Sequence, residues 1–281
     1  MRRPRARNLR GLPFNRMIPN ILTMLALCAG VTSIHFALEA QWGNAVLAFF
    51  TAAILDGLDG RVARILKGTS KFGAELDSLS DFVSFGVAPP LVLYLWTMHN
   101  AGNIGWVLVL LFSVCCALRL ARFNTALEAP EKPAWAYNFF TGVPSPAGAG
   151  LVLLPMVLSF ELGSGFFDEP AVVGVFMVAV AFLMVSRIPT FAFKKFHVAP
   201  RWVLPMMLAF GLLAAGLVTA PWMTLATLGV IYLIGIPISI QTYRRMETQA
   251  AKIRARGSED TAPDGGASVI RLDTDGQSAK K

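Results

Sequence analysis

Charged side chains are scarce in this chain. Only 15% of its 281 residues are Asp, Glu, Lys or Arg, and 55% are hydrophobic, whereas soluble domains carry roughly 25% charged residues. Stretches such as 44–55 and 202–222 contain no charged residue at all. The shortage of charge argues against a soluble fold, and the long apolar runs predict membrane-spanning helices of about 20 residues each.

Cysteine and histidine are also scarce, with three residues of each. Cys28, Cys115 and Cys116 lie inside apolar runs. Adjacent cysteines lack the spacing of a zinc site, and an odd number cannot all pair as disulfides within one chain. We therefore interpret all three as buried apolar side chains. The histidines fall on separate segments and form no recognisable site.

Apolar segments predict eight membrane-spanning helices. Their ranges are 17–38, 44–65, 73–97, 104–122, 145–161, 170–188, 202–219 and 223–243. Helices are expected because a bilayer core offers the backbone no water, and because uniformly apolar runs lack the alternation of a barrel. The first segment exceeds the apolar core of a signal peptide, which has about 7–15 residues, so we expect it to be retained.

The expected organisation is therefore that of an all-α integral membrane protein in three parts. A basic arm covers residues 1–16, and a transmembrane catalytic domain covers 17–245. From about residue 246 the apolar pattern stops and small polar residues dominate, so we expect a disordered tail at 246–281.

Basic residues lie on one side of the eight-helix arrangement. With a cytoplasmic N-terminus, all 25 Lys and Arg residues fall in the termini or in the cytoplasmic loops and helix ends. The charged residues of the opposite loops are all acidic, namely Glu39, Glu161, Asp168 and Glu169. This segregation follows the positive-inside rule, places both termini in the cytoplasm and explains the net charge of +8 without a nucleic-acid partner.

Four aspartates fall within two neighbouring expected spans. A charge at membrane depth costs about 2.5–3.5 kcal/mol even on a lenient scale, so a group of four needs a partner. Asp56 and Asp59 lie about 60° apart on a helix, and Asp77 and Asp81 about 40° apart, so each pair shares a face. A short connection at 67–71 predicts an antiparallel hairpin carrying all four carboxylates in its cytoplasmic halves.

Carboxylate oxygens favour hard cations, and four of them would hold a pair of Mg²⁺ or Mn²⁺ ions. Gly57, Gly60 and Gly73 leave room for a ligand or a helix to approach, and Arg64 adds a positive charge near the acids. Together these features indicate phosphate chemistry, in which a carboxylate would deprotonate an attacking hydroxyl. The alternative from the residues alone is a role of single aspartates in a proton relay or ion pathway.

The spacing of these residues resembles the signature of the CDP-alcohol phosphotransferases, also called CDP-alcohol phosphatidyltransferases. The matching pattern is Asp56-x2-Asp59-Gly60-x2-Ala63-Arg64-x8-Gly73-x3-Asp77-x3-Asp81. The resemblance implies a helical membrane enzyme with a six-helix core. Such an enzyme uses a pair of divalent metal ions, and the hydroxyl of an acceptor displaces CMP from a CDP-linked donor. It implies metal ligation by Asp56, Asp59 and Asp77, and for Asp81 the role of catalytic base with possible metal contact.

The resemblance also implies that the CDP group contacts the first half of the signature, at Asp59, Gly60, Ala63, Arg64 and Gly73. Three further segments, 19–23, 119–124 and 140–146, look like the bacterial membrane-embedded phosphatidylserine synthases of the family. That branch implies CDP-diacylglycerol and L-serine as substrates, and a homodimer in the bacterial inner membrane with its active site facing the cytoplasm. The candidate contacts for serine or the lipid phosphate are Arg119, Arg122, Asn124, Asn20 and Thr23.

Two alternatives stay open at this point. The first keeps the reaction but changes the acceptor to glycerol 3-phosphate, inositol phosphate or choline. The second is a cation-coupled or proton-coupled transporter. All four aspartates lie toward one surface, whereas transporter sites lie near the midplane, which favours the enzyme.

Overall fold

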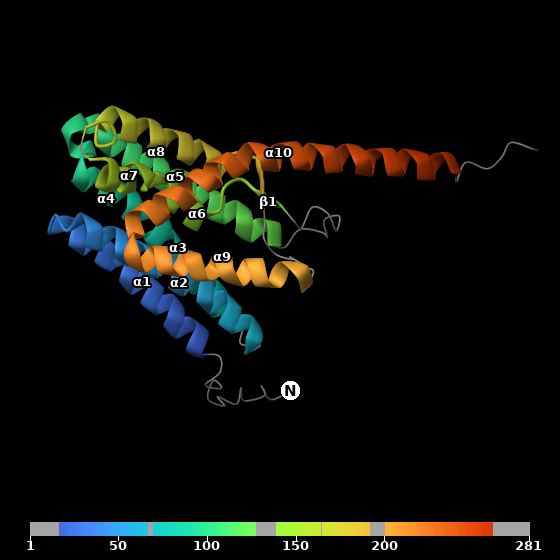
Figure 1. The fold of residues 1–281 in the computed structure, drawn as a ribbon, viewed down its shortest axis with the longest axis horizontal. Helices are drawn as coiled ribbons and strands as arrows, with labels where there is room; N and C mark the ends of the chain where they lie inside the picture. The colour runs from blue at the N-terminus through green and yellow to red at the C-terminus, as the bar shows by residue number, and fades with distance from the viewer. Residues whose placement is uncertain (1–16, 67–69, 128–138, 164, 192–199, 261–281) are drawn as a thin grey trace, which may run out of the picture. The chain divides into compact units, whose positions relative to one another are not determined.

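The computed structural model describes residues 17–66, 70–127, 139–163, 165–191 and 200–260, and this part of the chain is almost entirely helical. The elements, shown in Figure 1, are α1 (Met17–Leu38), α2 (Trp42–Ile65), α3 (Lys71–Asp81), η2 (Phe82–Val87), α4 (Ala88–Trp96), η3 (Met98–Ala101), α5 (Asn103–Leu127), β1 (Phe139–Thr141), α6 (Ser145–Val152), α7 (Leu154–Leu162), α8 (Pro170–Val185), β2 (Pro189–Phe191), α9 (Pro200–Thr219) and α10 (Pro221–Asp260). Each of the eight ranges expected to span a membrane contains a helix.

Six helical segments in the described part of the chain are long and apolar enough to cross a membrane. They are Met17–Leu38, Lys71–Trp96, Asn103–Ala126, Ser145–Leu162, Arg201–Thr219 and Pro221–Met246. The other two expected spans are not among these six segments, each for its own reason. Helix α8 has only 16 residues, and α2, although 24 residues long, carries two aspartates and two arginines in its second half.

The third expected span is one helical run with a change of pitch. It begins as α3, continues as the π-helix η2 directly after Asp81, and ends as α4. A π-helical turn is wider than an α-helical turn and often occurs at functional sites. The change of pitch therefore starts at the last aspartate of the signature.

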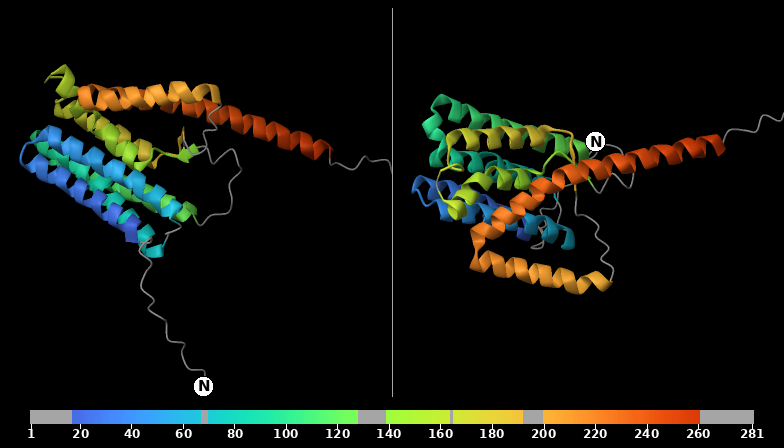
Figure 2. Two further views of the ribbon diagram at one scale, coloured as in Figure 1. Left: turned by 60° about the horizontal axis from the view of Figure 1, so that its bottom comes forward. Right: turned by 45° about the horizontal axis from the view of Figure 1, so that its top comes forward.

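Most of the packed core comes from α1, α2, η2, α4, α5, α6, α7 and α8. Helix α1 packs mainly against α2, and α5 against α8, and both pairs run side by side in Figures 1 and 2. Phe49 of α2 and Phe85 of η2 are fully buried, with ring centroids 6.0 Å apart and planes nearly perpendicular. Gly30 of α1 lies so close to Ser84 that any side chain there would meet the Ser84 backbone. These contacts fix α1 and α2 against the third span.

A short antiparallel strand pair joins the segment before α6 to the segment after α8. Phe140 of β1 pairs with Thr190 of β2, and the Thr190 hydroxyl donates to the Gly142 carbonyl oxygen at 2.9 Å. Gly142 has a φ of +78°, which favours glycine, and the chain then enters α6 at Ser145. The strand pair holds these two connections together.

Two expectations need correction. Cys28 is exposed on α1 and is not a buried side chain, although Cys115 and Cys116 are buried as expected. Helix α10 continues to Asp260, so residues 246–260 of the expected disordered tail are helical. That segment is rich in Ala, Glu, Gln, Lys and Arg, which favour helices. Residues 1–16 and 261–281 lie outside the described part, and residues up to Gln241 form one compact unit that contains the site below.

Candidate active site

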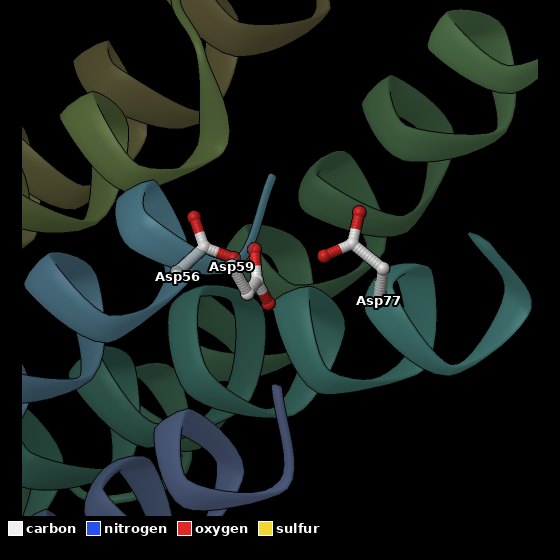
Figure 3. Close-up of side chains that lie close together, drawn as sticks. All are labelled: Asp56, Asp59 and Asp77. Carbon is white, nitrogen blue, oxygen red and sulfur yellow. The ribbon is translucent and has the colours of Figure 1, made fainter. Parts of the chain in front are cut away.

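Three carboxylates from two helices converge. Asp56 and Asp59 come from α2 and Asp77 from α3, and one carboxylate oxygen of each lies within 4.8 Å of the others. Figure 3 shows the carboxyl group of Asp77 turned toward those of Asp56 and Asp59. Asp59 is only 4% exposed, while Asp56 and Asp77 are half-buried. Three of the four aspartates that the sequence places in one cluster therefore come together in the structure.

Asp81 lies beside this group and not within it. Its carboxyl group is within hydrogen-bonding reach of that of Asp56, and its Oδ1 is buried with no hydrogen-bond partner among the described residues. Two ionised carboxylates this close repel each other unless a proton or a cation lies between them. Asp81 is thus placed differently from the other three aspartates, with an oxygen free for another group.

Helix α1 supplies the hydrogen bond that orients the cluster. The Thr23 hydroxyl donates to Asp59 Oδ2 at 2.6 Å, and the Ser80 hydroxyl of α3 donates to the Thr23 backbone carbonyl at 3.2 Å. Thr23 and Ser80 are buried. Helix α1 therefore connects α2 and α3, and it packs against both of them. The expected two-helix hairpin is completed by a third helix.

A cavity of about 210 Å³ adjoins the carboxylates. Its lining residues come from α1, α2 and α3 with the N-cap of α3, and they are Pro19, Asn20, Thr23, Asp59, Gly60, Ala63, Ser70, Gly73, Ala74 and Asp77. Four residues expected to contact the CDP group are among them. The fifth, Arg64, is exposed, and its Nε donates to the Gly60 carbonyl oxygen at 3.0 Å.

Gly73 allows the close approach that shapes one wall of this cavity. A Cβ atom at Gly73 would lie 2.8 Å from Asn20 Oδ1 and 3.1 Å from Ser70 Oγ. The Ser70 side chain accepts a hydrogen bond from the Gly73 amide at 3.0 Å and so caps α3. Ser70 was absent from the expected site, although a serine directly before a helical segment is a typical N-cap signal.

Arg119 of α5 reaches the same region from the other side. Its Nη1 donates to Ser145 Oγ at 2.7 Å, its guanidinium lies 5.6 Å from the centre of the Phe123 ring, and it interacts electrostatically with Asp81. Its Nε is buried without a hydrogen-bond partner among the described residues. A positive charge with an unused donor thus lies near the carboxylate with an unused oxygen.

The remaining candidate acceptor contacts make other interactions. Arg122 is exposed and donates to the Val185 carbonyl oxygen at the end of α8 at 2.6 Å, a common way to satisfy a helix terminus. Asn124 donates to Ser78 Oγ at 2.9 Å and is exposed. Asn20 and Thr23, by contrast, both line the cavity.

The donor set suits a divalent metal. All the ligand atoms are carboxylate oxygens, which Mg²⁺ and Mn²⁺ prefer. Among the described residues no Lys or Arg nitrogen lies within 4.0 Å of a carboxylate oxygen of this cluster. The ion pair in the described part of the chain joins His35 and Glu39, outside the cluster. Asp56, Asp59 and Asp77 therefore lack the cationic side chain that would otherwise offset their charges.

The fold and this site define a multi-pass membrane protein with a cluster of carboxylates beside an open cavity. The chain belongs to the CDP-alcohol phosphatidyltransferase family, because that family's sequence model matches residues 16–222. It is 42% identical over 245 residues to the CDP-diacylglycerol–serine O-phosphatidyltransferase of Mycobacterium leprae, covering 86% of this chain and 79% of the relative.

Other similar proteins carry the same name. The Mycobacterium tuberculosis protein is 40% identical over 232 residues, covering 82% of this chain and 80% of the relative. The Bacillus subtilis protein is 36% identical over 178 residues, covering 63% of this chain and 92% of the relative. The similarity therefore extends well beyond the aspartate signature.

Replacing Thr23 with Val should weaken metal binding. The substitution removes the hydrogen bond to Asp59, and loss of a group that orients a ligand typically lowers metal affinity about 10–100-fold. Isothermal titration of the purified protein with Mn²⁺ measures the change. Thr23→Ser keeps the hydroxyl and should bind like the wild type, as should Thr32→Val on the exposed face of α1. Equal affinity of Thr23→Val and wild type would contradict the orienting role.

Proposed function

We propose that this protein transfers the phosphatidyl group of CDP-diacylglycerol to L-serine and releases CMP. The observation that carries the proposal is the cavity next to the carboxylates, which is lined by family signature residues Asp59, Gly60, Ala63 and Gly73. The acceptor is inferred from the relatives at 40–42% identity, whose names specify serine. The reaction belongs to phospholipid biosynthesis.

In this proposal Asp56, Asp59 and Asp77 would hold the divalent metals, and Asp81 would be a further ligand. When bound, the metals supply positive charge that neutralises the diphosphate of the donor. Gly60, Ala63 and Gly73 leave room for the CDP group, and Asn20 borders it from α1. Arg64, which is exposed in the last turn of α2, contacts the donor.

Asp81 acts as the general base. Its unpartnered Oδ1 accepts the proton of the serine hydroxyl as the serine oxygen bonds to the phosphorus that carries diacylglycerol. The bond from that phosphorus to the CMP oxygen breaks, and CMP leaves with the electron pair. Arg119 offers its unused Nε to the serine carboxylate, a charge-assisted contact that orients the acceptor. Arg122 and Asn124 border the acceptor's entry from the water side.

The topology that fits this chemistry has eight spans with both termini in the cytoplasm. Helices α2 and α8 complete the count, and the one-sided distribution of Lys and Arg gives the orientation. The protein then lies in a bacterial inner membrane, and its active site faces the cytoplasm. The catalytic domain at 17–245 and the homodimer implied by the family resemblance stay predictions.

Cysteine labelling tests the topology. In a cysteine-free variant, Gln41→Cys in the connection between α1 and α2 should react with an impermeant maleimide added outside intact spheroplasts. Arg245→Cys on α10 should react only after the membrane is opened. Both positions are exposed. Labelling of Arg245→Cys from outside would reverse the orientation or change the number of spans.

An acceptor panel tests the reaction. The purified protein with CDP-diacylglycerol and Mn²⁺ or Mg²⁺ should release CMP with L-serine, and chelation of the metal should stop it. Glycerol 3-phosphate, inositol phosphate and choline should give at most background release. CMP release with one of these in place of serine would change the acceptor, and no release with any acceptor would refute the enzyme function.

Replacing Asp81 with Asn should abolish turnover while donor binding remains. Removing a general base lowers the rate by roughly 100-fold to 10,000-fold, so CMP release should fall by at least about 100-fold. Glu75→Gln, an equivalent change at an exposed position of the same helix, should have wild-type activity. Loss of CDP-diacylglycerol binding in Asp81→Asn, measured by calorimetry, would instead assign Asp81 to metal ligation alone.

A further inference from the structure

A second cavity runs along one face of α10. Its volume is about 280 Å³, and it is lined by Thr190 of β2 and by Leu228, Ile231, Tyr232, Gly235, Ile236 and Ser239. The α10 residues recur at intervals of three and four, which places them on one face of the helix. A Cβ atom at Gly235 would meet nothing within 4 Å, so the missing side chain opens the middle of the groove.

The groove changes character along its length. Leu228 and Ile231 are 39% and 59% exposed, so this apolar end opens to the surroundings of the helix. Ile236 and Ser239 are buried, and Ser239 and Thr190 make the other end polar. The eleven-residue separation of Leu228 and Ser239 corresponds to about 16 Å of helix. This is about half the thickness of a bilayer core of about 30 Å, so the groove is long enough for much of one acyl chain.

Two hydroxyl groups at the polar end have no acceptor. Tyr232 Oη and Ser239 Oγ are buried, and neither has a hydrogen-bond partner among the described residues. The Thr190 hydroxyl lies near Tyr232, and because its hydrogen is donated to the Gly142 carbonyl oxygen, it has none left to donate to a ligand. A buried hydroxyl without a partner costs about 1–3 kcal/mol. The polar end is therefore suited to a ligand group that accepts hydrogen bonds.

The polar end is also connected to the candidate active site. Tyr232 interacts electrostatically with Arg119, and Arg119 interacts with Asp81. A ligand whose polar part lies at Tyr232 is thus within electrostatic range of Arg119, which is proposed to orient the acceptor. Almost all of α10 lies outside the family match at residues 16–222, so the groove is an addition to the matched region.

We propose that this groove binds one acyl chain of the CDP-diacylglycerol donor, a role that rests on the proposed function. The chain enters from the membrane past Leu228 and Ile231 and lies over Gly235. The ester carbonyl oxygen of that chain accepts hydrogen bonds from Tyr232 and Ser239. An ester carbonyl only accepts hydrogen bonds, which complements two donors without acceptors. Burying the chain against Leu228, Ile231 and Ile236 stabilises the complex through the hydrophobic effect.

Filling the groove tests the proposal. Gly235→Leu should raise the KM for a dioleoyl donor about 10-fold or more, and the KM for serine should not change. Gly211→Leu on α9 is the matched control, because a Cβ atom there also meets nothing within 4 Å, and it should behave like the wild type. With a donor whose chains are too short to reach Gly235, both variants should match the wild type. An unchanged KM for the dioleoyl donor, or an equal increase for both donors, would overturn the proposal.

The hydroxyl contacts have their own test. The wild type should bind an ester-linked donor more tightly than the ether-linked analogue, which lacks the carbonyl oxygen. The combined variant Tyr232→Phe and Ser239→Ala should bind the two donors equally. If the variant prefers the ester-linked donor as strongly as the wild type does, Tyr232 and Ser239 do not contact the ester carbonyl oxygen.

Photolabelling separates failure of this inference from failure of the proposed function. A CDP-diacylglycerol probe with a diazirine in one acyl chain should label residues 228–239 of the wild type, whichever acceptor the enzyme uses. Excess unlabelled donor should suppress this labelling, and Gly235→Leu should lose it while Gly211→Leu retains it. Competed labelling elsewhere in the chain, with none on this face of α10, would overturn the groove. Absence of CMP release with every acceptor would refute only the proposed function.

Discussion

The structure depends on the cost of placing carboxylates at membrane depth. Each aspartate within an apolar helix needs a compensating interaction, and here Asp56, Asp59 and Asp77 gather so that one partner can serve all three. The surrounding helices are arranged to permit this. Helix α1 contacts both aspartate-bearing helices, and Gly73 lets Asn20 come close beside the cluster.

Helix α1 is apolar and looks like a simple membrane anchor, but its first turns have a further role. Thr23 donates from its side chain to Asp59 and accepts from Ser80 at its backbone. One residue thereby relates the positions of two helices that are separated in sequence by a connection partly outside the described residues. A hydrogen bond in a site of low dielectric constant is stronger than in water, so a single hydroxyl has a large effect on carboxylate orientation.

The two sides of Asp81 differ in chemistry. On one side lie the carboxylates and the cavity between α1, α2 and α3, and on the other lie Arg119 and Ser145. Beyond Arg119, Tyr232 leads to an apolar groove on α10. A reaction between a lipid-soluble donor and a water-soluble acceptor needs such an arrangement, because the substrates arrive from different solvents and must meet at one phosphorus atom.

The sequence by itself determined the helical membrane class and the four aspartates, because scarce charge in apolar runs makes each acid conspicuous and helical periodicity fixes which acids share a face. It did not indicate that Asp81 lies beside the group of three, that Thr23 contacts Asp59, or that Arg122 contacts the end of α8. Nor did it separate Gly235 from the other glycines of the apolar helices. Those features depend on how helices distant in sequence pack against one another, and local periodicity carries no information about that packing.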